Sequence, residues 1–190
     1  MIRVIIKRWF DVIFSALIII ILIPLWIIVP IIIKIDSPGR VIFKQKRMGR
    51  DSKLFTMYKF RSMKEGVPDM PAEKVEDHSK MYTRFGAFLR RFSIDELPQL
   101  FNVLKGDMSV VGPRPSHLGQ HGQIKIRKET GSDVMRPGLT SLSIVRGRDD
   151  LSIEEKAEFD HQYVFDSSLF IDIPILLKTV KIVLTGKGSN

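Results

Sequence analysis

The chain has 190 residues, 44% of them hydrophobic and 27% charged, which excludes a disordered or collagen-like protein and suits one compact domain with an added segment. It contains no Cys and only four His, which excludes a disulfide scaffold and a Cys nucleophile and argues against a zinc site. The net charge is +9, and residues 1–50 hold nine Lys or Arg against two Asp, whereas the remaining residues hold 21 basic and 19 acidic side chains. Because the positive charge surrounds an apolar segment, it favours an anionic membrane surface over a nucleic acid as partner.

Residues 12–33 form an almost uninterrupted apolar run, in which only Ser15, Pro24 and Pro30 are not apolar. As a helix, this run would be roughly 33 Å long, which is enough to cross the core of a bilayer. The run is too long for a signal peptide, and no small-x-small cleavage site follows it. We therefore expect the segment to be retained and to meet lipid.

Two features of this run argue against a simple span. Both flanks are basic, so the positive-inside rule places both ends on the cytoplasmic side. Pro24 removes a helix hydrogen bond near the middle of the run and favours a kink. We expect a re-entrant membrane helix over residues 1–35, with a kinked helix that spans once as the alternative. Asp11, next to the run, is expected to pair with Lys7 or Arg8 one turn away.

Residues 36–190 predict a compact α/β domain that is mostly helical. Alternating apolar and polar residues predict two strands, over 41–46 and 54–60. Helical spacing and a terminating glycine predict helices over 81–92, 97–105, 119–128 and 153–165. Residues 64–80 are charged, contain two Pro and lack periodicity, so we expect a mobile surface loop there.

A last apolar segment spans residues 169–184. At helical spacing, one side of this segment is apolar and carries Ile173, Leu176, Leu177, Val180 and Leu184. Lys178 and Lys181 fall on the other side, and the segment is short for a membrane span. It predicts either a basic amphipathic helix lying in the plane of the membrane or a helix of the domain core.

Two adjacent carboxylates, Asp95 and Glu96, stand at the start of a predicted helix in Ser93-Ile-Asp-Glu-Leu-Pro-Gln-Leu100. On the structural interpretation, Ser93 caps the helix and Ser-x-x-Glu forms a capping box. On the functional interpretation, one carboxylate attacks an electrophile or binds Mg²⁺ while its neighbour tunes charge and proton transfer. The residues alone leave both interpretations open.

Basic residues near this pair and on stiff turns are candidates for binding phosphate. In chain order they are Lys59, Arg61, Arg90, Arg91, Arg114, Arg136, Arg146 and Arg148. Arg114 lies between two prolines, and Arg136 precedes Pro-Gly. The planar guanidinium fork suits phosphate oxygens, although a solvated surface residue or a cap on carbonyl groups is the alternative for each. The sequence contains no Gly-rich nucleotide loop of the Walker or Rossmann type.

With these pieces in order, the chain resembles the bacterial sugar transferase family in its small, monotopic phosphoglycosyl transferase form. The resemblance runs over nearly the whole chain, and its motifs are specific when taken together. They are Lys7-Arg8-x-x-Asp11, Lys59-Phe-Arg-Ser-Met63, Asp95-Glu-Leu-Pro-Gln-Leu100, Asn102-Val-Leu-Lys-Gly-Asp-Met-Ser109, Val111-Gly-Pro-Arg-Pro115 and Arg136-Pro-Gly138.

The resemblance implies an enzyme that moves a phosphosugar from a UDP-sugar to polyprenyl (undecaprenyl) phosphate, releases UMP and initiates glycoconjugate or polysaccharide assembly. It implies that Asp95 attacks the β-phosphate to form a covalent intermediate, with ping-pong kinetics. It further implies that Mg²⁺ lies near Asp95 and that Glu96 assists metal placement or proton handling. The expected substrate-binding residues are Lys59, Arg61, Arg90, Arg114, Arg136 and Arg148. A re-entrant helix would hold the enzyme among phospholipids at the cytoplasmic face of the bacterial inner membrane.

The chain departs from the family pattern in two regions. Ile23-Pro24 stands where the family commonly has Ser-Pro at the membrane break. Residues 136–142 read Arg-Pro-Gly-Leu-Thr-Ser-Leu in place of the family's Arg-Pro-Gly-Ile-Thr-Gly-Trp, and Arg146-Gly-Arg148 replaces Asn-Gly-Arg. These changes lie near the expected substrate region and bear on the choice of sugar, but they leave the Asp-Glu pair intact.

Two other functions fit parts of the sequence. A non-catalytic, membrane-anchored adaptor that binds anionic lipid and partner proteins would explain the N-terminal charge and the C-terminal helix. It gives no reason for two carboxylates beside Arg residues on rigid turns. An anchored nucleic-acid binder is disfavoured by the near-neutral charge of residues 51–190.

Overall fold

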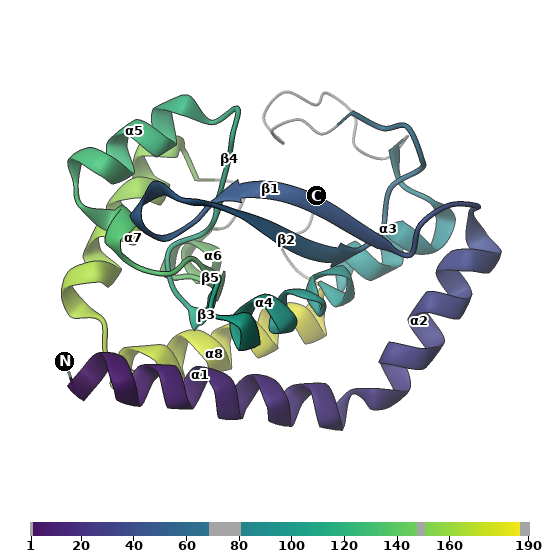
Figure 1. Ribbon diagram of the computed structural model, residues 1–190, viewed down its shortest axis with the longest axis horizontal. Coiled ribbons are helices and arrows are strands. Elements are labelled where there is room, and N and C mark those ends of the chain that lie inside the picture. The colour runs from purple at the N-terminus through teal and green to yellow at the C-terminus, as the bar shows by residue number, and fades with distance from the viewer. Residues whose placement is uncertain (1, 69–80, 148–150, 187–190) are drawn as a thin grey trace.

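The computed structural model describes residues 2–68, 81–147 and 151–186 of the protein. Helices dominate this part of the chain, which confirms the predicted α/β, mostly helical fold (Figure 1). The helices are α1 (Ile2–Ile21), α2 (Ile23–Asp36), α3 (Arg84–Arg91), α4 (Gln99–Lys105), α5 (His121–Glu129), α6 (Leu142–Arg146), α7 (Ile153–Asp166) and α8 (Leu169–Thr185). The strands are β1 (Ile42–Met48), β2 (Leu54–Phe60), β3 (Ser109–Val111), β4 (Ser116–His117) and β5 (Gly138–Thr140). Short 3-10 helices are η1 (Arg50–Ser52), η4 (Ile94–Glu96) and η5 (Ser132–Val134).

The helices predicted for the domain correspond to α3, α4, α5 and α7, with bounds that differ by three residues or fewer. The loop predicted over 64–80 falls mostly outside the described residues. Helix α4 ends at Gly106, whose positive φ of 92° places it in the left-handed region that glycine tolerates. The sequence periodicity was therefore sufficient to locate these helices.

Strands β1 and β2 form an antiparallel hairpin, which confirms both predicted strands. Ile42 pairs with Phe60 at one end of the hairpin. Strand β4 joins the other edge of β1, where Arg47 lies opposite His117. The resulting sheet has the order β2-β1-β4 and brings His117, from the middle of the chain, beside a strand near its start.

Strands β3 and β5 form a second, parallel pair, in which Ser109 lies opposite Gly138. The connection between them includes α5, as a parallel pair requires a long crossover. A Cβ atom on Gly138 would clash with the backbone of Gly112, so glycine permits the close approach of the two strand ends. This approach fixes the start of the turn that carries Arg114.

Two clusters of buried apolar side chains form the core. The larger cluster joins β2, α4, β3, α7 and α8 through Phe55, Met57, Val103, Met108, Val110, Val111, Tyr163 and Ile175. The smaller cluster joins α2, β2 and α3 through Val29, Ile33, Phe60 and Leu89. Because β2 contributes to both clusters, the hairpin connects the two halves of the core. Helix α2, the second half of the predicted membrane segment, packs against the globular part of the protein.

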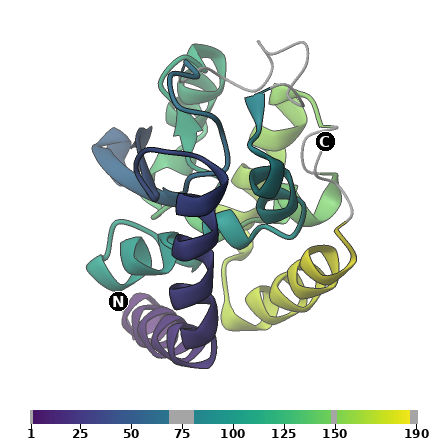
Figure 2. The same ribbon diagram turned by 90° about the vertical axis from the view of Figure 1, so that its right-hand side faces the viewer.

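Helices α1 and α2 meet at a bend of 64°, which confirms the predicted kink near Pro24. Pro24 lies in the first turn of α2, where it has no N–H to donate to the preceding turn. Figure 2 shows α2 rising away from α1. Among the described helices, none is long and apolar enough to cross a membrane alone, whereas this bent pair has the length and composition of a broken span or a re-entrant loop.

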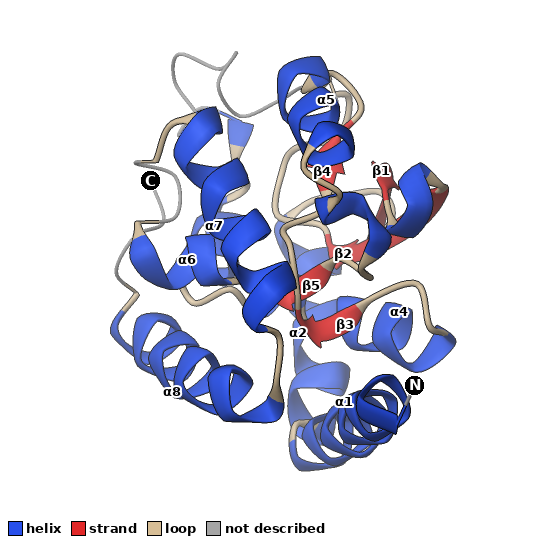
Figure 3. Ribbon diagram, turned by 90° about the vertical axis from the view of Figure 1, so that its left-hand side faces the viewer, coloured by secondary structure: helices blue, strands red, loops and turns tan. Residues whose placement is uncertain are grey.

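Helices α1 and α8 lie along the same side of the molecule, below β3 and β5 (Figures 1 and 3). Both expose large apolar side chains, including Trp9, Ile13, Leu17 and Ile20 on α1 and Phe170, Ile173, Leu177, Val180 and Leu184 on α8. The five α8 residues are called the α8 stripe below. The predicted apolar face needs one correction, because Leu176 packs against the core beside buried Ile175 instead of joining this stripe. One side of helix α8 therefore packs in the core, as one of the two predictions has it, and the α8 stripe on its other side is exposed.

A buried carboxylate docks α1 on the domain. Asp11, which is 2% exposed, accepts hydrogen bonds from the Ser109 hydroxyl at 2.8 Å and the Val110 N–H at 3.0 Å. Lys7 Nζ lies 3.3 Å from Asp11, which confirms the predicted pair, and 2.8 Å from Asp172 of α8. Lys7 thus lies between two buried carboxylates and offsets part of their charge where α1, β3 and α8 meet.

Arg8 provides a second attachment for α1. Its guanidinium donates to the carbonyl of Val103 at 2.6 Å and to the carbonyl of Leu104 at 2.9 Å. Both carbonyls lie in the last turn of α4, at the negative end of the helix dipole, which favours a cation. The apolar helix is thus bound to the domain by polar contacts on one side.

Asn102 holds β2 against α4. It is fully buried, its Oδ1 accepts from the Tyr58 N–H at 3.0 Å, and its Nδ2 donates to the Thr56 carbonyl at 2.7 Å. We expect Asn102→Ala to lower the free energy of unfolding by about 2–4 kcal/mol, because it leaves two backbone groups unpaired and opens a cavity. Urea denaturation in detergent, followed by Trp fluorescence, measures the change.

The exposed Lys125→Ala variant is the control for this experiment and should change the unfolding free energy by no more than about 0.5 kcal/mol. An Asn102→Ala protein as stable as this control would show that the amide does not hold the hairpin.

Candidate active site

Asp95 and Glu96 lie in η4, the 3-10 turn between α3 and α4. Ser93, just before this turn, has a positive φ of 52° and its side chain caps no backbone N–H, so the predicted capping box is wrong. The left-handed backbone at Ser93 turns the chain too sharply for its hydroxyl to reach the next turn. A capping box does form at the start of α7, between Ser152 and Glu155. The turn at η4 leaves Asp95 only 3% exposed.

The two neighbouring carboxylates face different cavities. Asp95 lines a cavity of about 400 Å³, called the large cavity, and Glu96 lines one of about 90 Å³, called the small cavity. Glu96 Oε1 lies 2.8 Å from Lys59 Nζ of β2, and each side chain is 18% exposed. Such a charge-assisted hydrogen bond holds both groups in a defined position. Lys59 lines both cavities, so this side chain lies between the cavity that Asp95 lines and the cavity that Glu96 lines.

Cations dominate the border of the large cavity. They are Arg40, Lys44, Arg47, Lys59, Arg61, Lys64, Arg90 and Arg114, against the two acidic residues Glu65 and Asp95. The guanidinium of Arg90 also lies over the ring of Tyr82, at 5.4 Å from its centroid, which restricts its motion. A buried carboxylate among fixed cations is suited to attack on a negatively charged electrophile such as a phosphate.

Arg61 reaches the large cavity but its guanidinium is already engaged. The side chain is 7% exposed and donates to the carbonyls of Ser37 and Pro38, each at 2.6 Å. A weaker ion pair joins it to Glu65 at 3.8 Å. Arg61 therefore fixes the connection between α2 and β1, at the wall of the cavity.

Among the expected substrate-binding residues that the structure describes, Arg136 is not brought to this site. Arg136 lines neither cavity, and its Nε donates to the Gly106 carbonyl at 2.8 Å, next to the end of α4. Burial, together with nearby Arg8, lowers its pKa. Arg148 lies outside the described residues. Asp95, Glu96, Lys59, Arg90 and Arg114, by contrast, meet around the two cavities.

Several residues of the small cavity were not singled out from the sequence. They are Arg47, Gln99, His117, Gln120, Gln123 and Lys156. Of these residues, only Arg47 could have been identified from the sequence, because the alternation of β1 places it on the same face as Gln45. Gln45 is buried, and its side-chain oxygen accepts a hydrogen bond from Arg47 Nε at 2.8 Å. The others come from elements far apart in the chain and are assembled only by the fold.

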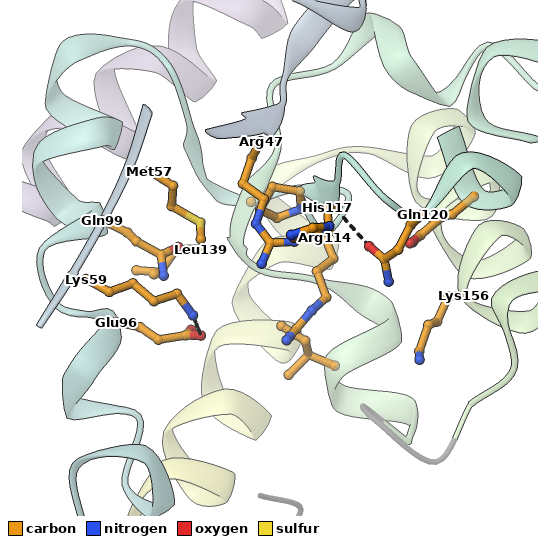
Figure 4. Close-up of a pocket in the computed structure, with 14 residues that line it drawn as sticks. Arg47, Met57, Lys59, Glu96, Gln99, Arg114, His117, Gln120, Leu139 and Lys156 are labelled. Carbon is orange, nitrogen blue, oxygen red and sulfur yellow. Dashed lines mark hydrogen bonds and ion pairs between the residues drawn. The ribbon is translucent and has the colours of Figure 1, made fainter. Parts of the chain in front are cut away.

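Figure 4 shows how the small cavity is built. Lys59 and Glu96 border one end, Lys156 and Gln120 lie at the other, and Arg47, His117 and Arg114 gather between them. His117 Nδ1 accepts a hydrogen bond from the Gly119 N–H at 2.9 Å, so the neutral ring carries its proton on Nε2. Its backbone N–H donates to Gln120 Oε1 at 2.8 Å, which orders the start of α5 against β4.

A buried ion pair stands behind the turn that carries Arg114. Arg127 and Asp160 are 3% and 1% exposed, and their charged atoms lie 4.0 Å apart. Arg127 Nη1 donates to the Arg114 carbonyl at 3.1 Å and to the Ser116 hydroxyl at 3.2 Å. Burial raises the pKa of Asp160 to about 6, although the charge of Arg127 opposes this shift. The pair connects α5 and α7 to the backbone that presents Arg114.

Comparison with known proteins gives a consistent result. Residues 2–186 match the family described as bacterial sugar transferase. The exopolysaccharide production protein PSS of Rhizobium leguminosarum bv. phaseoli is 40% identical over 197 residues, which cover 97% of this chain and 98% of that protein.

Two longer relatives have names that state an activity. The UDP-N-acetylgalactosamine-undecaprenyl-phosphate N-acetylgalactosaminephosphotransferase of Aeromonas hydrophila is 38% identical over 192 residues, covering 97% of this chain and 45% of that protein. The UDP-glucose:undecaprenyl-phosphate glucose-1-phosphate transferase of Escherichia coli K12 is 38% identical over 182 residues, covering 92% of this chain and 39% of that protein. The chain thus spans less than half the length of these two relatives.

We expect ionisation of Asp160 to weaken the fold as the pH rises. Its pKa of about 6 in the folded protein lies above the ordinary value of 3.8, so the folded state binds this proton more tightly than the unfolded chain does. The contribution of this group to the free energy of unfolding therefore falls between about pH 4 and pH 6. Relative to wild type, Asp160→Asn should gain about 2 kcal/mol of unfolding free energy between pH 4 and pH 7.

Urea denaturation of both proteins across this pH range measures the difference. Glu129→Gln, which removes an exposed carboxylate from α5, is the control for the loss of one acidic group. A difference between wild type and Asp160→Asn that stays constant with pH would contradict the raised pKa.

Proposed function

The chain belongs to the bacterial sugar transferase family, and from this we propose that it moves a phosphosugar from a UDP-sugar to undecaprenyl phosphate, releasing UMP. The observation that carries the proposal is Asp95, a carboxylate only 3% exposed that borders a cavity ringed by cations. Relatives named for this type of transfer support it. The product would initiate the assembly of a polysaccharide or another glycoconjugate.

The proposed reaction has two displacements at one phosphorus atom. A carboxylate oxygen of Asp95 attacks the β-phosphorus of the UDP-sugar, and the bond from that phosphorus to the bridging oxygen breaks, so UMP leaves with the electron pair. An oxygen of undecaprenyl phosphate then attacks the same phosphorus, and the Asp95 carboxylate leaves. The product is a sugar joined to the lipid by a diphosphate, and the free carboxylate is restored.

Cations at the border of the large cavity would stabilise the charge in both steps. Phosphoryl transfer depends mainly on positioning and charge neutralisation, for which Arg90 and Arg114 supply guanidinium groups. Glu96 would act through Lys59, because their 2.8 Å contact holds the ammonium group between the two cavities. In this arrangement Asp95 attacks, and Glu96 keeps a cation in place.

Mg²⁺ fits this site in one specific mode. In the described part of the chain, no group of three or more His, Cys, Asp or Glu could hold a metal ion by itself. Mg²⁺ is commonly held by one or two carboxylates together with substrate phosphates, and Asp95 can supply the carboxylate, since Glu96 is committed to Lys59. When bound, the ion would supply charge neutralisation on the diphosphate.

The apolar surface suggests how the protein would meet its lipid substrate. The bent pair α1–α2 would enter the cytoplasmic face of the bacterial inner membrane as a re-entrant helix, with both basic flanks on that face. The α8 stripe, which lies on the same side of the molecule as α1, would rest at the interface with the phospholipids. The undecaprenyl chain could then stay in the bilayer while its phosphate reacts, which avoids exposing its apolar surface to water.

A membrane-anchored adaptor would share this surface, but it gives no role to a buried carboxylate beside cations. Asp95→Asn separates the two functions. We expect this variant to lower UMP release by at least about 10³-fold, because an amide does not attack phosphorus under these conditions. The assay supplies a panel of UDP-sugars, Mg²⁺ and undecaprenyl phosphate in detergent.

The matched control is Asp51→Asn, which removes a carboxylate that is 49% exposed and lies away from both cavities. It should retain the wild-type rate. Without undecaprenyl phosphate, a labelled phosphosugar should remain attached to the wild-type protein and be missing from Asp95→Asn. Equal rates for wild type and Asp95→Asn would rule out the proposed intermediate.

The re-entrant arrangement predicts that both ends of the helix pair face the cytoplasm. Because the chain contains no Cys, Arg3→Cys and Ser37→Cys each introduce a single thiol. In intact spheroplasts neither thiol should react with a membrane-impermeant maleimide, and both should react after lysis. Labelling of one position from outside would instead indicate a single kinked span.

A further inference from the structure

The turn that carries Arg114 is held at its first half by β5. The Gly112 N–H donates to the Thr140 carbonyl at 3.0 Å. The Gly138 N–H donates to the Pro113 carbonyl at 2.9 Å. The second half of the turn, from Arg114 onwards, is held differently, by a side chain of α5.

Arg127 of α5 makes this second attachment. Its Nη1 donates to the Arg114 carbonyl at 3.1 Å and to the Ser116 hydroxyl at 3.2 Å. Ser116 lies opposite Met48 at the edge of the sheet, so one guanidinium joins the turn to the strand that follows it. Arg127 is only 3% exposed, and a hydrogen bond shielded from water in this way is stronger than one at the surface.

Asp160 of α7 lies on the other side of Arg127. The carboxylate is 1% exposed, and its Oδ2 lies 4.0 Å from Arg127 Nε. Burial raises the pKa of this carboxyl, while the charge of Arg127 and the backbone N–H of Arg114 oppose the rise. The buried pair thus faces both backbone groups of Arg114, its N–H and its carbonyl.

A buried ion pair is a costly way to join two helices. Nε and Nη2 of Arg127 are buried and, in the part of the chain that the structure describes, have no hydrogen-bond partner. Unpaired buried donors cost free energy, and apolar residues of similar volume often stabilise a protein as well as a buried ion pair or better. Stability alone therefore does not account for these charges between α5 and α7, whereas a role at the Arg114 backbone does.

We propose, on the basis of the proposed function, that Arg127 is a positioning residue for the transfer and acts through Arg114. By holding the Arg114 backbone, it sets where the Arg114 guanidinium meets the phosphates of the donor. Arg127 is not among the described residues that line either cavity, whereas Arg114 lines both. A displacement of about 1 Å in a group that orients the substrate can lower a rate by about 10²-fold, so loss of this attachment affects the reaction from a distance.

A variant that removes the charges without leaving one of them unpaired tests the proposal. Arg127→Met together with Asp160→Leu replaces both groups with apolar side chains of similar size, so its urea midpoint should be no lower than that of wild type. Its kcat/KM for UMP release should nonetheless fall by at least about tenfold, because the Arg114 carbonyl has lost its donor. A double variant with the kcat/KM of wild type would overturn the inference.

The Arg114→Ala background separates positioning from a general loss of stability. Arg127→Met should lower kcat/KM by at least about tenfold in the wild-type background and by less than about twofold when Arg114 is already Ala, because two residues that act as one unit are not additive. The same loss in both backgrounds would also overturn the inference. Lys125→Met, on the exposed side of α5, is the matched control and should stay within about twofold of wild type.

The inference and the proposed function fail in different ways. UMP release that depends on Asp95 but not on Arg127 would remove the inference and leave the transferase function standing. A wild-type protein that releases no UMP from any UDP-sugar would reject both.

Discussion

The docking of α1 by a buried carboxylate is the contact on which the arrangement of this protein depends. Asp11 binds β3 through Ser109 and Val110, and β3 runs directly into the turn that presents Arg114. Arg8 binds the end of α4, whose start follows the Asp-Glu turn. A helix whose outer side is apolar is thus joined to both elements that carry the site. The position of α1 is therefore tied to the positions of Asp95 and Arg114.

Two adjacent carboxylates acquire different surroundings because a tight turn separates them. Asp95 is buried at the wall of the large cavity, while Glu96 pairs with Lys59 at the border of the small one. The turn owes its shape to the left-handed backbone at Ser93. The buried pair behind the Arg114 turn adds rigidity on the opposite wall. Both walls of the site are therefore fixed by groups that need not touch a substrate.

Local patterns in the sequence were enough to predict the hairpin, most helices and the kink at Pro24, because each depends on periodicity or on one residue's backbone chemistry. The predicted cap at Ser93 failed because its backbone is left-handed, whereas a residue that caps a helix is normally extended. Arg61 resembled a phosphate ligand, yet its partners are carbonyls more than 20 residues earlier. Arg47 and His117 meet only through strand pairing across the chain. Long-range partners of this kind leave no signal in a single sequence.

The ion pair between Lys7 and Asp172 joins α1 to α8, the first and the last of the described helices. A chain made from its N-terminus produces α1 long before α8, so Lys7 reaches its second partner only after α8 has been made. Until then, the domain lacks one wall of its larger core, because Ile175 of α8 belongs to that cluster. Helix α1 would thus be made first, and the larger core beside it would close last. Closure of the larger core and the second ion pair of Lys7 consequently both wait for the same helix, α8.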